Sequence, residues 1–267
     1  MERLGLIAGN GRFPLIFAQA ARSRNIGLVA TAIRGETHPD LGRVVDKITW
    51  IRLGEFKEIV NIFKNEGLKK VVMAGQIKPK HLFDKKIKWD DDIKNIFKDI
   101  ENRKADTIFR SIADRLKIEG IELLDSTLYL DEFLAKKGVL GRQQPTFDDW
   151  NDIYFGMEIA KIMGALDIGQ TVVVKNKAIL AVEAMEGTDA TILRGGRLGR
   201  GEVAVVKVSK PQQDMRFDIP VVGPRTIKTL ARVKARCLAI EAEKTLIIDK
   251  SVFLNLADKN NICVVGI

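Results

Sequence analysis

Residues 3–14, which read RLGLIAGNGRFP, decide the fold of the first half of the chain. Within them, residues 4–8 form a short apolar run and residues 9–11 form a turn rich in glycine. Pro14 then opens a stretch of helical spacing that continues to Asn25. A glycine turn between an apolar run and a helix that starts with proline is typical of a strand, a tight turn and a helix. This order predicts the first strand and helix of an α/β domain.

The alternation of strand-like and helix-like segments continues to about residue 125. Apolar runs and helical spacing predict further strands at residues 28–33, 47–51, 70–74 and 121–124, and helices at residues 55–65 and 107–119. Strands that alternate with helices form a sheet of mainly parallel strands covered by helices. We therefore expect an α/β fold whose first domain holds such a sheet.

The alternation is lost at residues 126–147, a polar stretch rich in turn residues that includes Pro145. We place the connection between two domains there. Beyond it, the apolar spacing predicts a helix at residues 148–164, with Asp148 as its candidate N-cap. The second domain therefore begins close to residue 148.

The remainder of the chain mixes strands with helices. Two strands should pair as a hairpin that turns at Asn176 and Lys177. The predicted strands are residues 171–174, 179–182, 203–208, 246–248 and 262–265, and the predicted helices are residues 227–236 and 251–259. This pattern predicts a distinct mixed α/β domain without fixing its topology.

The composition of the 267 residues is that of an ordinary globular protein, with 46% apolar and 30% charged residues. No apolar run approaches the roughly 18 residues that span a bilayer, and the amino end lacks a signal-peptide pattern. We therefore expect a cytoplasmic protein. Two cysteines and two histidines, His38 and His81, are too few and too scattered for a zinc cluster, and we expect both histidines at the surface.

A formal net charge of +9 favours anionic partners such as a phosphorylated small molecule or a phospholipid surface. Nucleic acid is disfavoured because zinc-finger spacing is absent and aromatic residues make up only 6% of the chain. Residues 78–88 hold five lysines, interleaved with large apolar residues that continue to Trp89. This pattern is typical of a segment that rests on an anionic membrane face, although a solvated loop would look similar.

The first candidate site is the glycine turn. Backbone N–H groups between a strand and a helix can approach phosphate oxygens, and a second loop at Gly75 and Gln76 also ends a predicted strand. Pro14 replaces the third glycine of the dinucleotide fingerprint, so the match is partial. Arg34 ends the second predicted strand, where an arginine would suit a 2′-phosphate. A structural turn without a ligand is the alternative.

The second candidate site is acidic. Glu183, Glu186 and Asp189 follow a predicted strand, and the intervening glycine lets the backbone turn. Asp214 and Asp218 flank Arg216, and in an extended segment the three side chains would share one face. Two carboxylates and a guanidinium suit a hard cation and a phosphate together, whereas the alternative is a surface ladder of ion pairs.

Four segments together resemble a known family. They are residues 5–14 (GLIAGNGRFP), 141–146 (GRQQPT), 183–189 (EAMEGTD) and 213–220 (QDMRFDIP). The chain resembles the UDP-2,3-diacylglucosamine pyrophosphatases of lipid A biosynthesis, of the LpxI type. The resemblance implies a Rossmann-like domain at residues 1–128, a linker at 129–147, a catalytic domain at 148–267, and a homodimer. It implies hydrolysis of a UDP-linked diacylated glucosamine to UMP and 2,3-diacylglucosamine 1-phosphate (lipid X), dependent on Mg²⁺ or Mn²⁺.

With this resemblance, the residues receive hypothetical roles. The catalytic residues are Asp214, Asp218 and Arg216, and the metal would be held by Asp214, Asp218, Glu186 and Asp189. Asp214 is favoured over Asp218 as the essential aspartate. The expected substrate-binding residues are Gly9, Asn10, Gly11, Gly75, Gln76, Gln143, Thr188, Lys210 and Gln213.

Because the substrate carries acyl chains, we expect transient association with the cytoplasmic face of the inner membrane, made by the lysine-rich segment. Two other functions compete with this one. The first is an NADP-linked oxidoreductase that uses the Gly9–Gly11 loop and Arg34. The second is a non-catalytic nucleotide-sugar-binding module in which the acidic residues are surface decoration.

Overall fold

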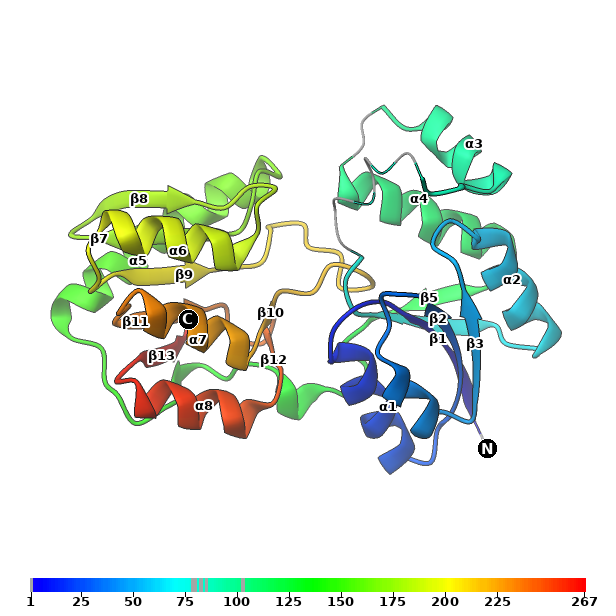
Figure 1. Cartoon of the computed structure of the whole chain (residues 1–267), viewed down its shortest axis with the longest axis horizontal. Coiled ribbons are helices and arrows are strands. Elements are labelled where there is room, and N and C mark those ends of the chain that lie inside the picture. The colour runs from blue at the N-terminus through cyan, green and yellow to red at the C-terminus, as the bar shows by residue number, and fades with distance from the viewer. Residues whose placement is uncertain (1, 78–80, 82–83, 85, 102–103) are drawn as a thin grey trace. The chain divides into compact units, whose positions relative to one another are not determined.

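The computed structural model describes residues 2–77, 81, 84, 86–101 and 104–267 and divides the chain into two compact units (Figure 1). The amino unit comprises Met1–Leu130 together with Asp214–Asp218. The carboxyl unit comprises Asp131–Gln213 and Ile219–Ile267. A short segment of the second half of the sequence therefore belongs to the first unit.

The amino unit is built on a five-stranded parallel sheet in the order β3-β2-β1-β4-β5. Its strands are β1 Arg3–Ala8, β2 Gly27–Ile33, β3 Lys47–Ile51, β4 Lys70–Ala74 and β5 Glu122–Leu124. These strands agree with the five expected from the apolar runs. They confirm an α/β fold with a mainly parallel first sheet.

The helices described in the amino unit are α1 Phe13–Ser23, α2 Phe56–Asn65, α3 Asp91–Asp99 and α4 Ala105–Ile118, with the 3₁₀ turn η1 Pro39–Arg43. Pro14 lies in the first turn of α1, as expected. The short helix α3 was not predicted; the side chain of Asp90 caps it by accepting a hydrogen bond from the Ile93 N–H. Side chains of α2, α3 and α4 pack with those of the sheet into one core cluster.

The carboxyl unit holds a six-stranded mixed sheet in the order β6-β13-β11-β9-β7-β8. The central strands β9, β11 and β13 are parallel, and β7 and β6 pair with their neighbours in the antiparallel sense. The strands are β6 Gly138–Val139, β7 Thr171–Lys175, β8 Ala178–Val182, β9 Ala204–Lys207, β11 Cys237–Ile240 and β13 Cys263–Gly266, beside a separate pair β10 Val221–Val222 and β12 Leu246–Ile247.

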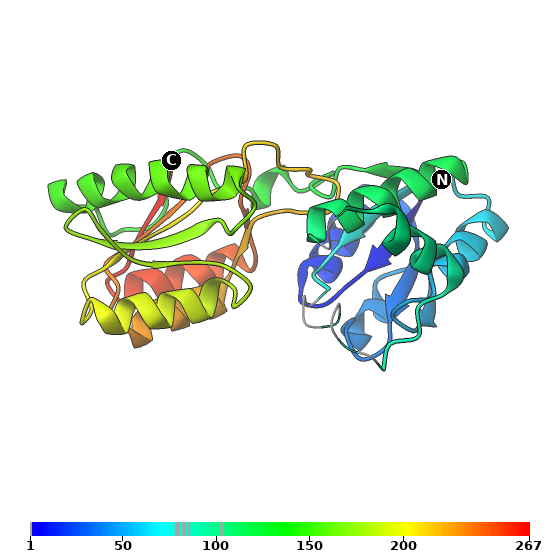
Figure 2. The same ribbon diagram turned by 90° about the horizontal axis from the view of Figure 1, so that it is seen from above.

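Helices cover both faces of this mixed sheet. Figure 2 shows α5 Phe147–Ala165 on one face and α6 Thr188–Leu198, α7 Pro224–Arg232 and α8 Lys250–Lys259 on the other. Two separate core clusters fill these layers, one beneath α5 and one beneath the other three helices. No helix in the described part of the chain is long and apolar enough to cross a bilayer.

In the carboxyl unit, the sequence predicted one hairpin turn correctly and one helix N-cap wrongly. The hairpin between β7 and β8 turns at Asn176 and Lys177, and both residues have positive φ, as a two-residue hairpin loop requires. The N-cap of α5, however, is Thr146 and not Asp148. The Thr146 hydroxyl accepts a hydrogen bond from the Asp149 N–H, and the Asp149 carboxylate accepts one from the Thr146 N–H.

The expected linker at residues 129–147 is largely built into the carboxyl unit. Gly138–Val139 forms the edge strand β6 on β13, and the Ala135 N–H donates to the carbonyl oxygen of Thr245. These hydrogen bonds tie the segment to the sheet. The boundary between the units therefore falls at Leu130 and Asp131.

Candidate functional site

The two glycine loops of the amino unit lie at the carboxyl ends of β1 and β4 and are bonded to each other. The Gly9 N–H donates to the Ala74 oxygen over 2.8 Å, and Asn10 and Gln76 exchange backbone hydrogen bonds of 2.8 and 3.1 Å. A Cβ atom at Gly75 would lie 2.7 Å from the backbone oxygen of Asn10. Glycine is therefore needed at position 75 for the loops to meet, which is a reason independent of any phosphate.

Open space remains beside Gly11. Its φ is +91°, and no atom of the described residues lies within 4 Å of a Cβ built there. Gly11 directly precedes Arg12, the N-cap residue of α1, and the backbone N–H groups of a first helical turn have no partners within the helix. Among the expected phosphate-binding residues of this loop, Gly11 is thus the one at which the backbone is open to a ligand.

A buried polar pair that the sequence did not indicate lies at the same edge of the sheet. His81 Nε2 is 2.8 Å from Glu36 Oε1, and the side chains are only 19% and 8% exposed. The Asn10 side chain donates to the backbone oxygen of Glu36. His81 was expected at the surface, because a partner 45 residues away cannot be recognised from spacing. Arg34 is exposed, and its N–H is bonded to the Ile51 oxygen.

The acidic segment of the amino unit is a compact turn and not the extended segment expected from the sequence. The N–H groups of Phe217 and Asp218 both donate to the backbone oxygen of Asp214, over 3.3 and 3.0 Å. The backbone of residues 214–218 is therefore folded back on itself and not extended. The Ser126 N–H donates to the Met215 oxygen, which fixes this turn beside the end of β5.

Within this turn, Asp214 and Arg216 form a two-pronged ion pair. Arg216 Nε lies 2.9 Å from Asp214 Oδ1, and Arg216 Nη2 lies 2.7 Å from Asp214 Oδ2. The hydrogen bonds from Arg216 outweigh the effect of burial and hold the pKa of Asp214 below its usual range; Asp214 in turn raises the pKa of Arg216. Asp214 is therefore an ionised carboxylate at neutral pH.

The other two expected metal ligands, Glu186 and Asp189, belong to the carboxyl unit and have cationic partners. Glu186 is 2.7 Å from Arg194, and Asp189 is 2.7 Å from Arg225. Backbone hydrogen bonds and Arg194 lower the pKa of Glu186 despite its partial burial. Within the described ranges, no group of three or more His, Cys, Asp or Glu side chains could hold a metal ion. The four expected carboxylates are divided between the two units, and the four-carboxylate metal site stays a prediction.

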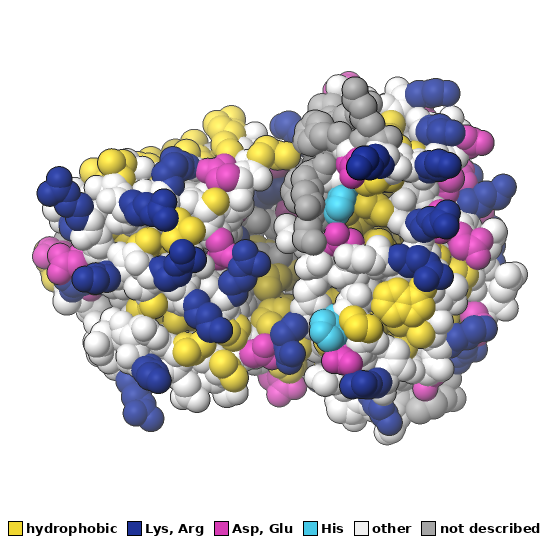
Figure 3. Space-filling model, in the orientation of Figure 1, with side chains coloured by type: hydrophobic (Ala, Val, Ile, Leu, Met, Phe, Trp, Pro, Cys, Tyr) yellow, Lys and Arg dark blue, Asp and Glu magenta, His cyan; other side chains and the backbone are white. Residues whose placement is uncertain are grey.

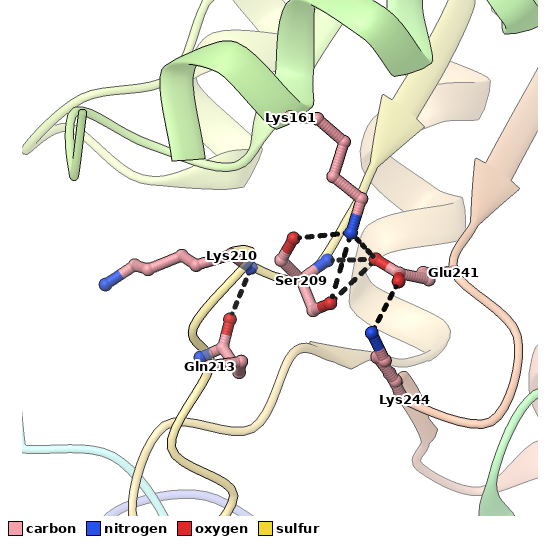
Figure 4. A network of polar contacts seen from close by, with 6 residues as sticks. All are labelled: Lys161, Ser209, Lys210, Gln213, Glu241 and Lys244. Carbon is pink, nitrogen blue, oxygen red and sulfur yellow. Dashed lines mark hydrogen bonds and ion pairs between the residues drawn. The ribbon is translucent and has the colours of Figure 1, made fainter. Parts of the chain in front are cut away.

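A polar network lies where β9 and β11 end in the carboxyl unit (Figure 4). Glu241 accepts hydrogen bonds from the Ser209 N–H, the Ser209 hydroxyl and Lys161, at 2.6–2.7 Å, and it pairs with Lys244 at 3.0 Å. Burial opposes the ionisation of Glu241, but the bonds from Lys161 and Ser209 outweigh it and lower its pKa to about 2. The network was not predicted, because its hydrogen-bonded members lie up to 80 positions apart in the sequence.

The chain that leaves this network leads directly to the Asp214 turn. The Lys210 N–H donates to Gln213 Oε1, and the Gln213 N–H donates to the Lys210 oxygen, which closes a turn (Figure 4). Lys210 Nζ pairs with Asp167 over 2.7 Å. Lys210 and Gln213 thus lie in the turn that precedes Asp214 in the sequence, and their expected contacts with the substrate stay predictions.

The two remaining expected substrate contacts lie elsewhere in the carboxyl unit. Thr188 is the first residue of α6; its hydroxyl donates to Glu183 and accepts from the buried Lys207. Gln143 is 3.5 Å from Asn261 through its side-chain amide.

Comparison with known proteins decides the family. Models of the LpxI N-terminal domain and of the LpxI C-terminal domain match residues 3–133 and 136–265. The chain belongs to the LpxI family. A protein of Caulobacter vibrioides, named UDP-2,3-diacylglucosamine pyrophosphatase LpxI, is 29% identical over 287 residues, which cover 100% of this chain and 98% of that protein.

Similarity between this LpxI chain and solved structures is distant. The ADP complex of an N5-carboxyaminoimidazole ribonucleotide synthetase is 12% identical with a TM-score of 0.30, over 65% of this chain and 32% of that chain. A biotin carboxylase domain of a thermophilic 2-oxoglutarate carboxylase is 12% identical with a TM-score of 0.29, over 65% and 35%. The LpxI chain thus spans about a third of these proteins, and the likeness carries no functional argument.

The LpxI domain division and the structural division differ at one place. The boundary of the family models, at residues 133–136, falls close to the structural boundary at Leu130 and Asp131. Asp214–Asp218 lies inside the C-terminal family domain, yet packs with the amino unit. In this LpxI chain, the candidate catalytic aspartate is therefore presented at the edge of the other domain's parallel sheet.

Proposed function

We propose that this protein hydrolyses the diphosphate of UDP-2,3-diacylglucosamine, a UDP-linked diacylated glucosamine, and releases UMP and 2,3-diacylglucosamine 1-phosphate. Family membership and the name of the Caulobacter vibrioides relative support this substrate. The observation that carries the proposal is the Asp214 turn, which brings an ionised carboxylate and a guanidinium to the carboxyl edge of a parallel sheet. Ligands of open α/β sheets bind at that edge.

The chemistry requires charge compensation. A diphosphate repels the water or hydroxide that attacks it, and cationic side chains lower that barrier. Arg216 supplies a planar guanidinium that can turn from Asp214 to a phosphate oxygen. Gly11 and the start of α1 offer backbone N–H groups to another phosphate oxygen. These groups would bind and orient the diphosphate.

Metal dependence is part of the proposal. Mg²⁺ in such enzymes is commonly held by one or two carboxylates together with substrate phosphates and water, and it does not need a complete protein cage. Asp214 and Asp218, in one turn, fit this limited role, with Mn²⁺ as an alternative ion. Glu186 and Asp189, the other two expected ligands, lie in the carboxyl unit, where each pairs with an arginine as Asp214 does. When bound, the ion would offset diphosphate charge and polarise a water.

Two partners complete the proposal, a second copy of the chain and an anionic membrane surface. The net charge is +9, and lysine and arginine side chains are spread over the face of both units seen in Figure 3. Of the lysine-rich segment expected to touch the membrane, residues 78–80, 82–83 and 85 lie outside the described residues. Light scattering tests the homodimer, and vesicle binding at low and high salt tests the membrane contact.

A turnover assay tests the function and the metal separately. Purified protein is incubated with UDP-2,3-diacylglucosamine in detergent micelles, first with EDTA and then with added Mg²⁺ or Mn²⁺, and UMP is measured. We expect no turnover in EDTA and recovery with either ion. Undiminished turnover in EDTA would overturn the metal requirement. Failure to release UMP with any ion would overturn the function itself.

The two competing functions lose support. An NADP-linked enzyme needs N–H groups of the first glycine loop for a pyrophosphate, but that of Gly9 is bonded to Ala74 at the end of β4 and that of Asn10 to Gln76 of the second loop. The carboxylate of Glu36 at the end of β2 would also repel a 2′-phosphate. A binding module without catalysis would produce no UMP in the assay above.

A further inference from the structure

The carboxyl unit has an open hollow of about 370 Å³ at the carboxyl ends of α6 and α7. Its uncharged lining is formed by Leu193, Gly196, Gly201 and Val233, and its other lining residues are cationic: Arg197, Arg200, Arg232 and Lys234. We call this surface the basic hollow. Among the described residues, no acidic side chain lines it, so four positive charges surround one concave surface.

The basic hollow lies at the opposite end of the strands from the Glu241 network. The strands β9 and β11 are parallel neighbours, and Gly201 precedes β9 as Lys234 precedes β11. Ser209 and Glu241 follow the carboxyl ends of the same two strands. The chain that leads to Asp214 leaves from that other end, so the four cations are not part of it.

The four cations are not needed to satisfy the helix ends. Basic side chains near the last turn of a helix commonly bond to its free carbonyl oxygens. Here the Gly201 N–H donates to the Gly196 oxygen over 3.0 Å. Lys175 Nζ donates to the oxygens of Gly199 and Gly201 over 3.0 and 3.1 Å. Within the described ranges, no side chain of the four cations is hydrogen-bonded to a carbonyl oxygen.

Across the described part of the chain, the four cations also have no carboxylate partner, although other arginines of the same helices do. Arg194 on α6 pairs with Glu186 over 2.7 Å. Arg225 on α7 pairs with Asp189 over 2.7 Å. Glu202, the acidic residue nearest to the hollow in the sequence, pairs with a lysine outside it. Like charges without counter-ions repel one another, so a multivalent anion bound there would stabilise the folded protein.

The backbone around the basic hollow is fixed. The Glu202 N–H donates to the Lys234 oxygen over 2.8 Å, which joins the two loops. A Cβ atom at Gly196 would lie 2.4 Å from the Cβ of Val233, so α6 and α7 meet without space for a larger residue. Arg200 and Lys234 have φ values of +55° and +52°, in the left-handed region that residues with side chains rarely adopt. Such conformations cluster at ligand sites.

We infer that the basic hollow binds phosphate groups that together carry at least two negative charges. Each guanidinium can donate two parallel hydrogen bonds to a phosphate group, and Lys234 adds a compact charge. Two sources carry this chemistry, a soluble phosphate compound and the headgroups of an anionic membrane. The inference does not rest on the proposed function, in which none of the four cations has a role.

A site-resolved titration tests the soluble source. In protein labelled with ¹⁵N-arginine, the Nε–Hε signals of Arg200 and Arg232 are identified by their absence from Arg200→Gln and Arg232→Gln. Both signals should shift saturably with inorganic diphosphate in EDTA at low salt, and the signal of the paired Arg194 should not. Arg200→Gln should raise the Kd reported by Arg232 at least roughly tenfold, because charge-assisted hydrogen bonds are lost.

Lys228→Gln is the matched control for this titration. Lys228 is exposed on α7 and does not line the basic hollow. Its substitution removes the same charge, so the Kd reported by Arg232 should change by less than about twofold. Arg200 is exposed as well, so neither substitution should lower the melting temperature strongly.

A sedimentation assay tests the membrane source. Phosphatidylcholine vesicles that contain a quarter of phosphatidylglycerol are mixed at low salt with two double variants of equal net charge. One is Arg200→Gln, Arg232→Gln, and the other is Lys228→Gln, Lys259→Gln, whose positions on α7 and α8 are exposed outside the hollow. If headgroups occupy the hollow, the first protein should bind at least roughly tenfold more weakly than the second.

The outcomes identify the source or overturn the inference. Saturable shifts with diphosphate and equal vesicle binding by the two double variants would assign a soluble phosphate. Weaker vesicle binding by the arginine variant, without such shifts, would assign membrane headgroups. Failure of both expected effects, or equal weakening by the hollow and control substitutions in both assays, would overturn the inference. Release of UMP is measured separately, so its absence would overturn the proposed function and leave the hollow standing.

Discussion

The hydroxyl oxygen of Ser126 lies 2.6 Å from the carbonyl oxygen of Arg216, which is 90 positions later in the chain. The same hydroxyl is 2.6 Å from the carbonyl oxygen of Met73 in β4, and Ser126 is buried. One proton is therefore shared between the sheet and the Asp214 turn. This contact, with the Phe109–Phe217 stack, fixes a segment of the C-terminal family domain on the amino unit.

Removing this hydroxyl should loosen the turn. Ser126→Ala leaves two partly buried carbonyl oxygens without this donor, and we expect a loss of about 1–3 kcal/mol in the free energy of unfolding. The value of kcat should fall by more than the fraction of unfolded protein accounts for, because this turn positions Asp214. Urea unfolding and kcat measure the two effects.

Ser111→Ala is the control for this substitution. Ser111 bonds to the Thr107 oxygen within helix α4 and does not hold the turn. We expect a change within about 0.5 kcal/mol and unaltered kcat. Equal kcat in Ser126→Ala and the unaltered protein would mean that the turn needs no such anchor.

Asp214 should be essential for turnover but not for folding. Asp214→Asn removes the charge and keeps the shape, so we expect kcat to fall at least roughly 100-fold while the melting temperature changes little. Glu186→Gln is the comparison, since Glu186 forms an exposed pair with Arg194, and it should keep activity within about twofold. A large loss of kcat in Glu186→Gln with little loss in Asp214→Asn would instead assign the metal to α6.

Glycine at positions 75 and 11 should matter for different reasons. Gly75→Ala forces a Cβ to 2.7 Å from the Asn10 oxygen at a φ of +93°, so we expect more than about 2 kcal/mol of destabilisation. Gly11→Ala has the same kind of φ but open space, and should cost about 1 kcal/mol. If Gly11 approaches a phosphate, Gly11→Ala should raise KM as well; an unchanged KM would remove Gly11 from the site.

The Glu241 network should give stability a defined pH dependence. The folded pKa of about 2 lies below the ordinary value of 4.5, so the contribution of Glu241 is complete above pH 4.5 and is lost as the pH falls towards 2. Glu241→Gln lacks this titration. The stability difference between the two proteins should therefore be largest near neutral pH and shrink on acidification.

Urea unfolding between pH 7 and pH 3 measures this difference. Glu243→Gln, an exposed neighbour, is the control and should follow the unaltered protein at each pH. A difference that stays constant across this range would show that the Glu241 charge does not stabilise the fold. Glu241 holds Ser209, and the next residue, Lys210, is bonded to Gln213, which directly precedes Asp214. We therefore expect reduced kcat in Glu241→Gln at pH 7.

Local patterns in the sequence were enough for most of the secondary structure. Apolar runs predicted the strands of the first sheet, and the loop of Asn176 and Lys177 predicted the hairpin. The N-cap of α5 was assigned to Asp148 because aspartate is a common cap. Thr146 competes for the same role, and its reciprocal hydrogen bonds with Asp149 decide between them.

The site was less predictable because its contacts are distant in sequence. A spacing of two between Asp214 and Arg216 fits both an extended segment and a turn, and only the bonds to Ser126 select the turn. The pairing of Asp189 with Arg225 cannot be foreseen from a run of acidic residues.

The central claim, that this protein hydrolyses a diacylated UDP-sugar at its diphosphate, is tested most directly in heavy-oxygen water. UDP-2,3-diacylglucosamine is incubated with protein and Mg²⁺ in H₂¹⁸O, and phosphorus NMR follows the products. We expect UMP and 2,3-diacylglucosamine 1-phosphate, one of them carrying a single ¹⁸O, and no products with Asp214→Asn. An unchanged phosphorus spectrum with the unaltered protein would contradict the account.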